Sequence, residues 1–163
     1  MLELKLKNPE VFQFPFQSYA TLTRLIQHLK ETDKPVKIME RSLLSARSCF
    51  VETLRALEMI KEGEYYVLLE WFDYIKDFHE IKSDLIIYIQ TQPEVAMDRI
   101  NLRSRKGEDA ITLDYLKEIH KRHEELFVEK ASTLPAKVIV IDGNLSKEEM
   151  IEEYKKCEKF ILR

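Results

Sequence analysis

Glycine is scarce in this sequence, and its scarcity excludes one kind of phosphate site. The 163 residues contain only Gly 3, and these glycines, Gly63, Gly107 and Gly143, are followed by Glu, Glu and Asn. A P-loop of the form G-x-x-x-x-G-K-S/T, which cradles nucleotide phosphates with backbone N–H groups, needs two glycines and a lysine in register. These residues contain no such loop.

Cysteine pairs, long apolar runs and excess positive charge are also lacking. Cys49 and Cys157 are far apart and outside any C-x-x-C motif, so we expect neither a disulfide framework nor a zinc site. Lys+Arg 26 against Asp+Glu 29 gives a formal net charge of -3, which excludes a global positive field for nucleic acid. No apolar run approaches the roughly 20 residues of a membrane span, and the start shows no targeting segment. We therefore expect an intracellular protein, cytoplasmic or mitochondrial, without nucleic-acid or membrane partners.

Apolar periodicity predicts a single domain in which helices alternate with strands. We expect helices over 16–29, 42–60, 64–78, 93–103, 113–130 and 147–160, and strands over 36–39, 85–89 and 138–141. The near-continuous apolar run 85–89 is typical of a strand covered on both faces. This alternation predicts an α/β fold with a parallel, doubly wound sheet, which binds ligands beyond the carboxyl ends of its strands.

Two charged segments follow predicted elements and suit phosphate or substrate hydroxyls. Arg99, Arg103 and Arg105 end the helix 93–103, and arginines three or four residues apart share one helix face and fit phosphate oxygens. A solvated basic helix end that satisfies its own carbonyls is the alternative. Glu40 and Arg41 follow the carboxyl end of the strand 36–39, where Arg41 could orient a substrate. The alternative is an N-cap with a structural ion pair.

Two further segments have a ligand interpretation that competes with a plainer one. Gln17 lies next to Phe16, and its amide offers a donor and an acceptor in one plane, as a nucleobase edge requires; a packed helix N-terminus is the alternative. His120 and His123 share a helix face but lack the H-E-x-x-H order and a third ligand, so we expect no metal site there. Trp71 on the helix 64–78 is expected in a core or a subunit interface.

Taken together, motifs along the whole chain resemble the animal deoxynucleoside kinases, which include insect multisubstrate kinase, mitochondrial thymidine kinase, and deoxycytidine and deoxyguanosine kinases. Each motif is weak alone, but five in register are specific. The motifs are Phe16-Gln17-Ser18-Tyr19; Met39-Glu40-Arg41-Ser42 with Ser45-Ala46-Arg47 and Cys49-Phe50-Val51-Glu52; Glu70-Trp71-Phe72-Asp73; Leu85-Ile86-Ile87-Tyr88; and Arg99-x3-Arg103-x-Arg105-x2-Glu108.

The resemblance assigns one group of residues to a deoxynucleoside. It implies that Gln17 hydrogen-bonds the base, that Phe50 stacks on it and that Phe16 lines the pocket. Arg41, with Glu40 before it, would lie beside the 5′-hydroxyl and hold the general base and the incoming phosphate. These implications fit phosphoryl transfer, in which positioned arginines stabilise charge on the transferred group.

The resemblance assigns a second group to ATP and to the sugar. The resemblance implies that Glu108 binds the sugar 3′-hydroxyl and that Arg99, Arg103 and Arg105 form an arginine lid over the ATP phosphates. The catalytic residues that it implies are Arg41, Arg103 and Arg105. The residues implied for ATP are Arg99, Arg103, Arg105, Asp142, Asn144 and Leu145, the last three bordering adenine. The ligands of Mg²⁺ are expected in the family's N-terminal part, and no metal ligand is expected here.

Three departures from the family pattern bear on function. By the resemblance, residues 1–163 correspond to the C-terminal two-thirds of the kinase domain. The expected fold is a P-loop-kinase-like parallel sheet with helices on both faces, and these residues lack its first two strands. Leu6 replaces the family's sugar-binding tyrosine and cannot donate to the 3′-hydroxyl. In the base pocket Arg24 resembles the deoxycytidine type, whereas Ala46 stands where that type has an aspartate.

Two hypotheses follow, and a third is more distant. The first is an enzyme that phosphorylates the 5′-hydroxyl of deoxynucleosides with ATP, inactive over these residues alone. The second is a non-catalytic relative that keeps the nucleoside pocket and the helices 42–60 and 64–78, through which the resemblance implies a homodimer. A nucleoside monophosphate kinase is the third, and the Glu40-Arg41-Ser42 and Phe16–Tyr19 motifs disfavour it. A P-loop in the coding region upstream of Met1 would favour the first.

Overall fold

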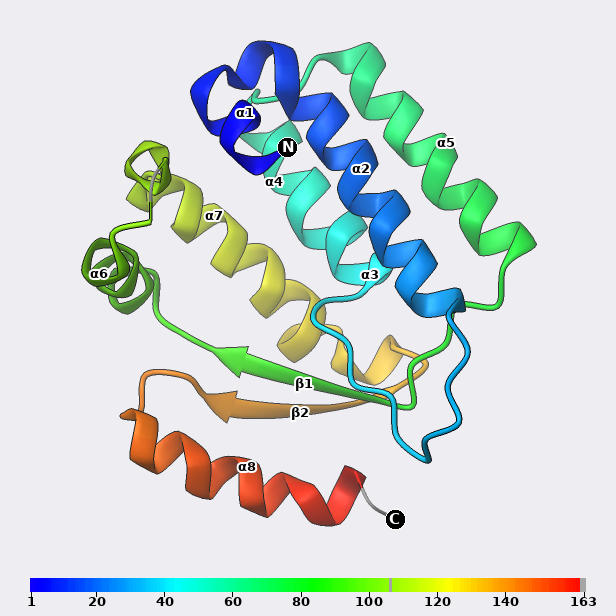
Figure 1. The fold of residues 1–163 in the computed structure, drawn as a ribbon, viewed down its shortest axis with the longest axis vertical. Helices are drawn as coiled ribbons and strands as arrows, with labels where there is room; N and C mark the ends of the chain where they lie inside the picture. Colours follow the sequence, from blue (N-terminus) through cyan, green and yellow to red (C-terminus); the bar gives the residue numbers. More distant parts are fainter. Residues whose placement is uncertain (106, 162–163) are drawn as a thin grey trace.

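In the computed structural model, which describes residues 1–105 and 107–161, two parallel strands separate a layer of helices from a single helix on the opposite face (Figure 1). The helices are α1 (Leu2–Lys7), α2 (Pro9–Leu29), α3 (Leu43–Ser45), α4 (Glu52–Ala56), α5 (Glu62–Phe78), α6 (Pro93–Arg103), α7 (Leu113–Glu124) and α8 (Lys147–Ile161), and the strands are β1 (Leu85–Gln90) and β2 (Lys137–Asp142). Two π-helical segments, Ala46–Val51 and Glu125–Glu129, and two 3-10 turns, Glu108–Ala110 and Ala131–Thr133, complete the described elements.

The sheet brings the carboxyl ends of its two strands together. Leu85 pairs with Lys137 and Gln90 with Asp142, so both strands end at the same edge. These strands confirm the predictions for 85–89 and 138–141. The expectation that 85–89 is covered on both faces is wrong for the described chain, because Ile87 is 37% exposed and Ile89 is 44% exposed.

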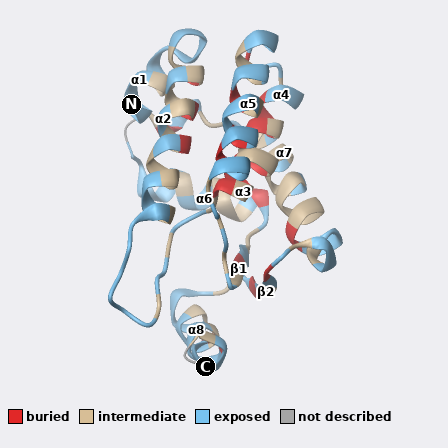
Figure 2. Cartoon of the chain, turned by 90° about the vertical axis from the view of Figure 1, so that its right-hand side faces the viewer, coloured by how far each residue is buried: buried red, intermediate tan, exposed pale blue. Residues whose placement is uncertain are grey.

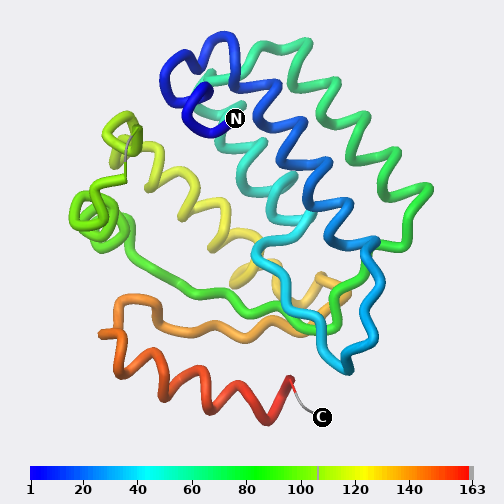
Figure 3. Tube along the Cα trace, in the orientation of Figure 1, coloured from blue at the N-terminus to red at the C-terminus, as the bar shows by residue number. Residues whose placement is uncertain are grey.

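The predicted strand 36–39 is not a strand in the structure. Within residues 1–105 and 107–161 the sheet has the order β1-β2, and 36–39 belongs to neither strand. This segment follows the loop that leaves α2 and passes toward the sheet before the chain returns to α3 (Figure 3). Ile38 is 83% exposed there. Val36 and Ile38 favour extended backbone, but a strand also needs a hydrogen-bonded neighbour.

The helices agree with the sequence in α5 to α8 and differ near the N-terminus. Helix α2 begins at Pro9 and contains Pro15, whereas the sequence predicts a helix only from Phe16. Proline suits the first helical position because its missing N–H would have no partner there, whereas inside a helix it removes one hydrogen bond. Helix α1 was not predicted. The helix expected over 42–60 is interrupted by the π-helical segment and ends at Ala56.

The buried residues gather on α3, the π-helical segment Ala46–Val51, α4, α5 and one face of α2, and the sheet and α8 contribute few of them (Figure 2). The larger buried cluster comprises Leu43, Ala46, Val51, Leu54, Ile60, Leu68, Phe72 and Ile75. On α5, Trp71 and Tyr74 are each 52% exposed, so they lie outside this core. None of the helices described has both the length and the apolar character to cross a bilayer.

Candidate functional site

The Glu40-Arg41-Ser42 segment leads directly to Phe50. Ser42 caps α3, since its side chain accepts from the Ser45 backbone N–H (3.0 Å) and its own N–H donates to the Ser45 hydroxyl (3.2 Å). Arg41 has a left-handed φ of 62°, which is uncommon for a residue with a Cβ. Its guanidinium carbon lies 4.3 Å from the centroid of the Phe50 ring. The cap proposed as the plainer interpretation is therefore present, and Arg41 lies over the Phe50 ring beside it.

A buried hydrogen-bond network joins α7 to the carboxyl end of β1. One carboxylate oxygen of Glu124 accepts from the Tyr88 hydroxyl (2.7 Å) and the other from the Gln90 side-chain amide (2.6 Å). Burial, and then the hydrogen bond to this carboxylate, raise the pKa of Tyr88. His123 stacks on Tyr88 with ring centroids 5.8 Å apart and meets Phe50 edge-on, also at 5.8 Å. The network thereby fixes the support beneath Phe50.

Sequence patterns did not single out Glu124 as a functional residue. The detectable signal was the order of residues in His120-x-x-His123-Glu124, which we weighed only as a metal site. Across the described residues no group of three His, Cys, Asp or Glu side chains has a metal-binding arrangement. His123 instead uses Nδ1 with the Ile119 carbonyl oxygen (2.7 Å), and it packs between aromatic rings.

One face of α2 presents buried polar residues in the same region. Gln13, Gln17 and Thr21 are 3%, 4% and 4% exposed, although polar side chains are seldom so buried. Burial lowers the pKa of Arg24 first, the Arg41 charge lowers it further, and Glu40 raises it. Arg24 therefore lies within electrostatic range of the Glu40-Arg41 segment.

The arginine lid closes on Glu108. Arg103 donates from Nε (3.1 Å) and Nη2 (2.8 Å) to the Glu108 carboxylate, and Arg105 lies 3.8 Å from it. Glu108 is only 6% exposed, whereas the side chains of both arginines are more than half exposed. Lys106, which follows Arg105 in the sequence, lies outside the described residues. The solvent-facing sides of the two guanidinium groups retain donors for phosphate oxygens.

Arg99 joins a different partner, the turn after β2. Its Nη1 donates to the Gly143 carbonyl oxygen (2.6 Å) and its Nη2 to the Leu145 carbonyl oxygen (3.1 Å). In the same turn the Asp142 carboxylate accepts from the Asn144 backbone N–H (2.9 Å). The residues implied for ATP thus form two groups, one at this turn and one at Glu108.

Gly143 is required by the close approach of this turn to β1. A Cβ on Gly143 would lie 2.2 Å from Thr91 Oγ1 and 2.9 Å from the Gln90 carbonyl oxygen, which already accepts the Gly143 N–H at 2.6 Å. Backbone contact of this kind excludes any side chain. The Asp142–Leu145 turn is therefore held against the end of β1.

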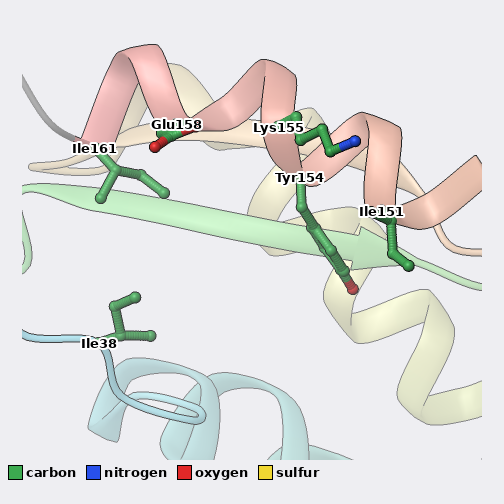
Figure 4. A pocket seen from close by; sticks show the side chains of 6 residues that line it. All are labelled: Ile38, Ile151, Tyr154, Lys155, Glu158 and Ile161. Carbon is green, nitrogen blue, oxygen red and sulfur yellow. The ribbon is translucent and has the colours of Figure 1, made fainter.

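The predicted site residues do not line the open groove beside α8. That groove lies between the segment 36–39 and α8. Its lining residues are Ile38, Ile151, Tyr154, Lys155, Glu158 and Ile161 (Figure 4). A second hollow, at the lid, includes Arg105 and Glu108. The lid hollow, rather than the apolar groove, coincides with chemistry-bearing residues.

The chain is similar in sequence to several known proteins over most of its length. The chain is 40% identical to human mitochondrial thymidine kinase 2 over 148 residues, which are 90% of this chain and 56% of that protein. It is 35% identical to human deoxycytidine kinase over 133 residues, covering 76% of this chain and 51% of that protein. Chicken (Gallus gallus) deoxycytidine kinase 2 is 30% identical over 171 residues, with 94% and 64% covered. The chain spans about half the length of the first two of these curated relatives.

The family match extends over nearly every residue. Residues 1–162 match the model of the family described as deoxynucleoside kinase. The motifs that carry the resemblance all lie within this match. The chain therefore belongs to the deoxynucleoside kinase family.

Proposed function

We propose that this chain supplies the nucleoside-binding and lid parts of an enzyme that transfers phosphate from ATP to the 5′-hydroxyl of a deoxynucleoside, a nucleotide-salvage reaction. The observation that carries the proposal is the position of Arg41, whose guanidinium lies 4.3 Å from the Phe50 ring centroid. A flat ring suited to a base and a cation suited to a developing phosphate charge then lie side by side.

The nucleoside contacts follow from the same arrangement. Phe50 and Phe16 would take the two sides of the base pocket, and the buried Gln17 amide would read the base edge. Arg24 and Ala46 would set base preference, since one adds a cation and the other leaves space. Glu108 would accept a hydrogen bond from the sugar.

The fit to ATP is partial. Arg103 and Arg105 expose donors beside the lid hollow, and the Asp142–Leu145 turn offers a rigid polar border for a purine. No backbone cradle for the phosphates occurs in this sequence, and the described residues include no group of three His, Cys, Asp or Glu side chains arranged to hold a metal ion. Bound ATP would supply the transferred phosphoryl group; these residues would bind and orient it.

A homodimer and an intracellular location, cytoplasmic or mitochondrial, form part of the proposal. Tyr66, Trp71, Tyr74 and Phe78 on α5 are between 52% and 68% exposed, a set of aromatics that suits burial against a second copy. Helix α3, the π-helical segment and α4 would form the rest of the interface, which would then extend from α3 to α5. The partners are then the deoxynucleoside and a second copy of the chain.

Phosphoryl transfer by a chimera tests the proposal. The N-terminal part of human thymidine kinase 2 that precedes the matched region would be fused to residue 1, and ATP-dependent phosphorylation of deoxycytidine and thymidine would be measured. We expect activity in the chimera and none in the 163-residue chain, because the chain has no P-loop. Arg41→Ala should abolish activity.

The matched control is Arg55→Ala, because Arg55 also lies over an aromatic ring, Tyr65 (5.4 Å), but away from Arg41 and Phe50. It should leave turnover unchanged. A folded chimera that binds deoxynucleosides without phosphorylating them would instead favour the non-catalytic nucleoside-binding alternative.

A further inference from the structure

Lys5 is the lysine of α1 that turns inward. Lys7 pairs with Glu3 at the surface (2.9 Å). Lys5 is half-buried, and its Nζ lies 5.8 Å from the ring centroids of both Phe16 on α2 and Tyr115 on α7. Burial lowers the pKa of this ammonium. A cation held between two rings at a partly dry position is unusual for a surface helix of charged residues.

The Lys5 ammonium has hydrogen-bonding capacity that its neighbours do not use. An ammonium carries three N–H donors, and an aromatic ring attracts the charge without accepting those hydrogen bonds as an oxygen does. Among residues 1–105 and 107–161, no oxygen accepts from Lys5 and no carboxylate pairs with it. Partial burial without an acceptor costs free energy, which a ligand oxygen at this point would recover.

The backbone of α1 places Lys5 beside the lid. Leu6, the next residue, packs on Gly107, where an added Cβ would lie 3.1 Å from Leu6 Cδ1. Glu108 follows Gly107 and is 6% exposed, with Arg103 holding its carboxylate. Lys5 therefore lies next to the residue that contacts Gly107, and its ammonium faces Phe16, which the resemblance assigns to the base pocket.

We propose that Lys5 is a substrate-binding residue whose ammonium donates a hydrogen bond to the 3′-oxygen of the deoxyribose, while Glu108 accepts the proton of the same hydroxyl. This proposal rests on the proposed function. A hydroxyl is both a donor and an acceptor, and an ionised carboxylate can only accept. Leu6 offers neither group, so Lys5 supplies a donor that Leu6 cannot.

Calorimetric titration of the 163-residue chain with deoxycytidine and with 2′,3′-dideoxycytidine tests this inference. The wild type should bind deoxycytidine more tightly, because only that ligand has the 3′-hydroxyl. Lys5→Met should weaken deoxycytidine binding by roughly 10-fold to 150-fold, as for a hydrogen bond to a charged group, and leave dideoxycytidine within about 2-fold. Lys7→Met, on the outer side of α1, should change neither Kd.

Tyr115 offers the competing explanation, because its ring centroid lies 5.8 Å from Lys5 Nζ and its hydroxyl is a hydrogen-bond donor. Tyr115→Phe keeps the ring and removes only this donor, and we expect it to preserve the preference for deoxycytidine. If Tyr115→Phe abolishes the preference and Lys5→Met does not, the assignment to Lys5 is overturned.

The remaining outcomes separate this inference from the proposed function. Equal wild-type affinity for the two ligands would overturn the role of Lys5 and leave the nucleoside pocket standing, and this comparison needs no variant to fold. Equal weakening of both ligands in Lys5→Met, with an unchanged circular dichroism spectrum, would do the same. Failure of the wild type to bind any nucleoside would overturn the proposed function and this inference together.

Discussion

Replacing Arg24 with methionine should change both stability and base preference. Its Nη1 donates to the Ala20 carbonyl oxygen of its own helix (3.0 Å), but its buried Nε finds no acceptor among the described residues. The Arg41 charge disfavours the guanidinium further. Ala46, where the resemblance places an aspartate in deoxycytidine-type kinases, offers only a methyl group.

The stability change can be worked from these contacts. An unsatisfied buried donor costs about 1–3 kcal/mol, and the lost bond to Ala20 is worth about 0.5–1.5 kcal/mol. Methionine fills irregular apolar space with a side chain of similar length. Arg24→Met should therefore stabilise the chain by about 1 kcal/mol, which raises Tm by roughly 2–4 °C for a domain of this size.

The same substitution should favour thymidine. By the resemblance Arg24 faces the base, where its guanidinium would crowd the thymine methyl group. Methionine would remove a buried polar mismatch worth about 1–3 kcal/mol, or roughly 5-fold to 150-fold in relative affinity. Titration calorimetry of wild type and Arg24→Met with thymidine and deoxycytidine gives this ratio, with Arg24→Lys as the control that keeps a charge. Thymidine as the tightest ligand of the wild type, or a fall in Tm for Arg24→Met, would refute the reasoning.

Three further predictions concern the pH response, the turn after β2 and assembly. Burial lowers the pKa of His123 below its ordinary 6.5, so the neutral imidazole contributes fully to stability above about pH 6.5 and this contribution is lost as pH falls below that value. The Tm of His123→Gln should therefore fall less than the wild-type Tm between pH 7.5 and 5.5. An equal fall in Tm would count against this prediction. Gly143→Ala should cost about 1–3 kcal/mol because of its contact with Thr91, whereas Gly63→Ala in α5, with no atom within 4 Å of the added Cβ, should not lower Tm. Sedimentation should show a dimer of the chimera at micromolar concentration that Trp71→Glu dissociates; a wild-type monomer would contradict the interface.

The sequence predicts the second half of the fold well because its signals there are local. Pro93 at a helix start and the apolar runs of β1 and β2 depend only on neighbouring residues, and the structure confirms them. The prediction of a strand at 36–39 was wrong because a strand needs a hydrogen-bonded neighbour, which a single run of residues cannot reveal. The predicted start of the helix at residue 16 was wrong for a related reason, since the packing of α2 tolerates the hydrogen bond that Pro15 removes.

The candidate site was predictable in its residue types and less so in its contacts. The arginines after β1 were found from spacing, but spacing could not show that Arg99 binds the turn at Gly143 while Arg103 binds Glu108. Lys5 gave no signal, because a lysine in a charged stretch is normally solvated. Its inward position follows from tertiary packing of α1 against α2, which local pattern does not encode.

Nucleoside binding at Phe50 is the claim on which the account depends. Titration calorimetry of the 163-residue chain with deoxycytidine, deoxyadenosine and thymidine measures it directly, with Phe50→Ala as the test variant and Phe78→Ala, at a ring that is 68% exposed on α5, as the matched control. The account predicts saturable binding that Phe50→Ala weakens roughly 5-fold to 150-fold, the value of about 1–3 kcal/mol for a stacked base, and that Phe78→Ala leaves unchanged. Binding that survives Phe50→Ala at full strength, or no binding of any deoxynucleoside, would contradict it.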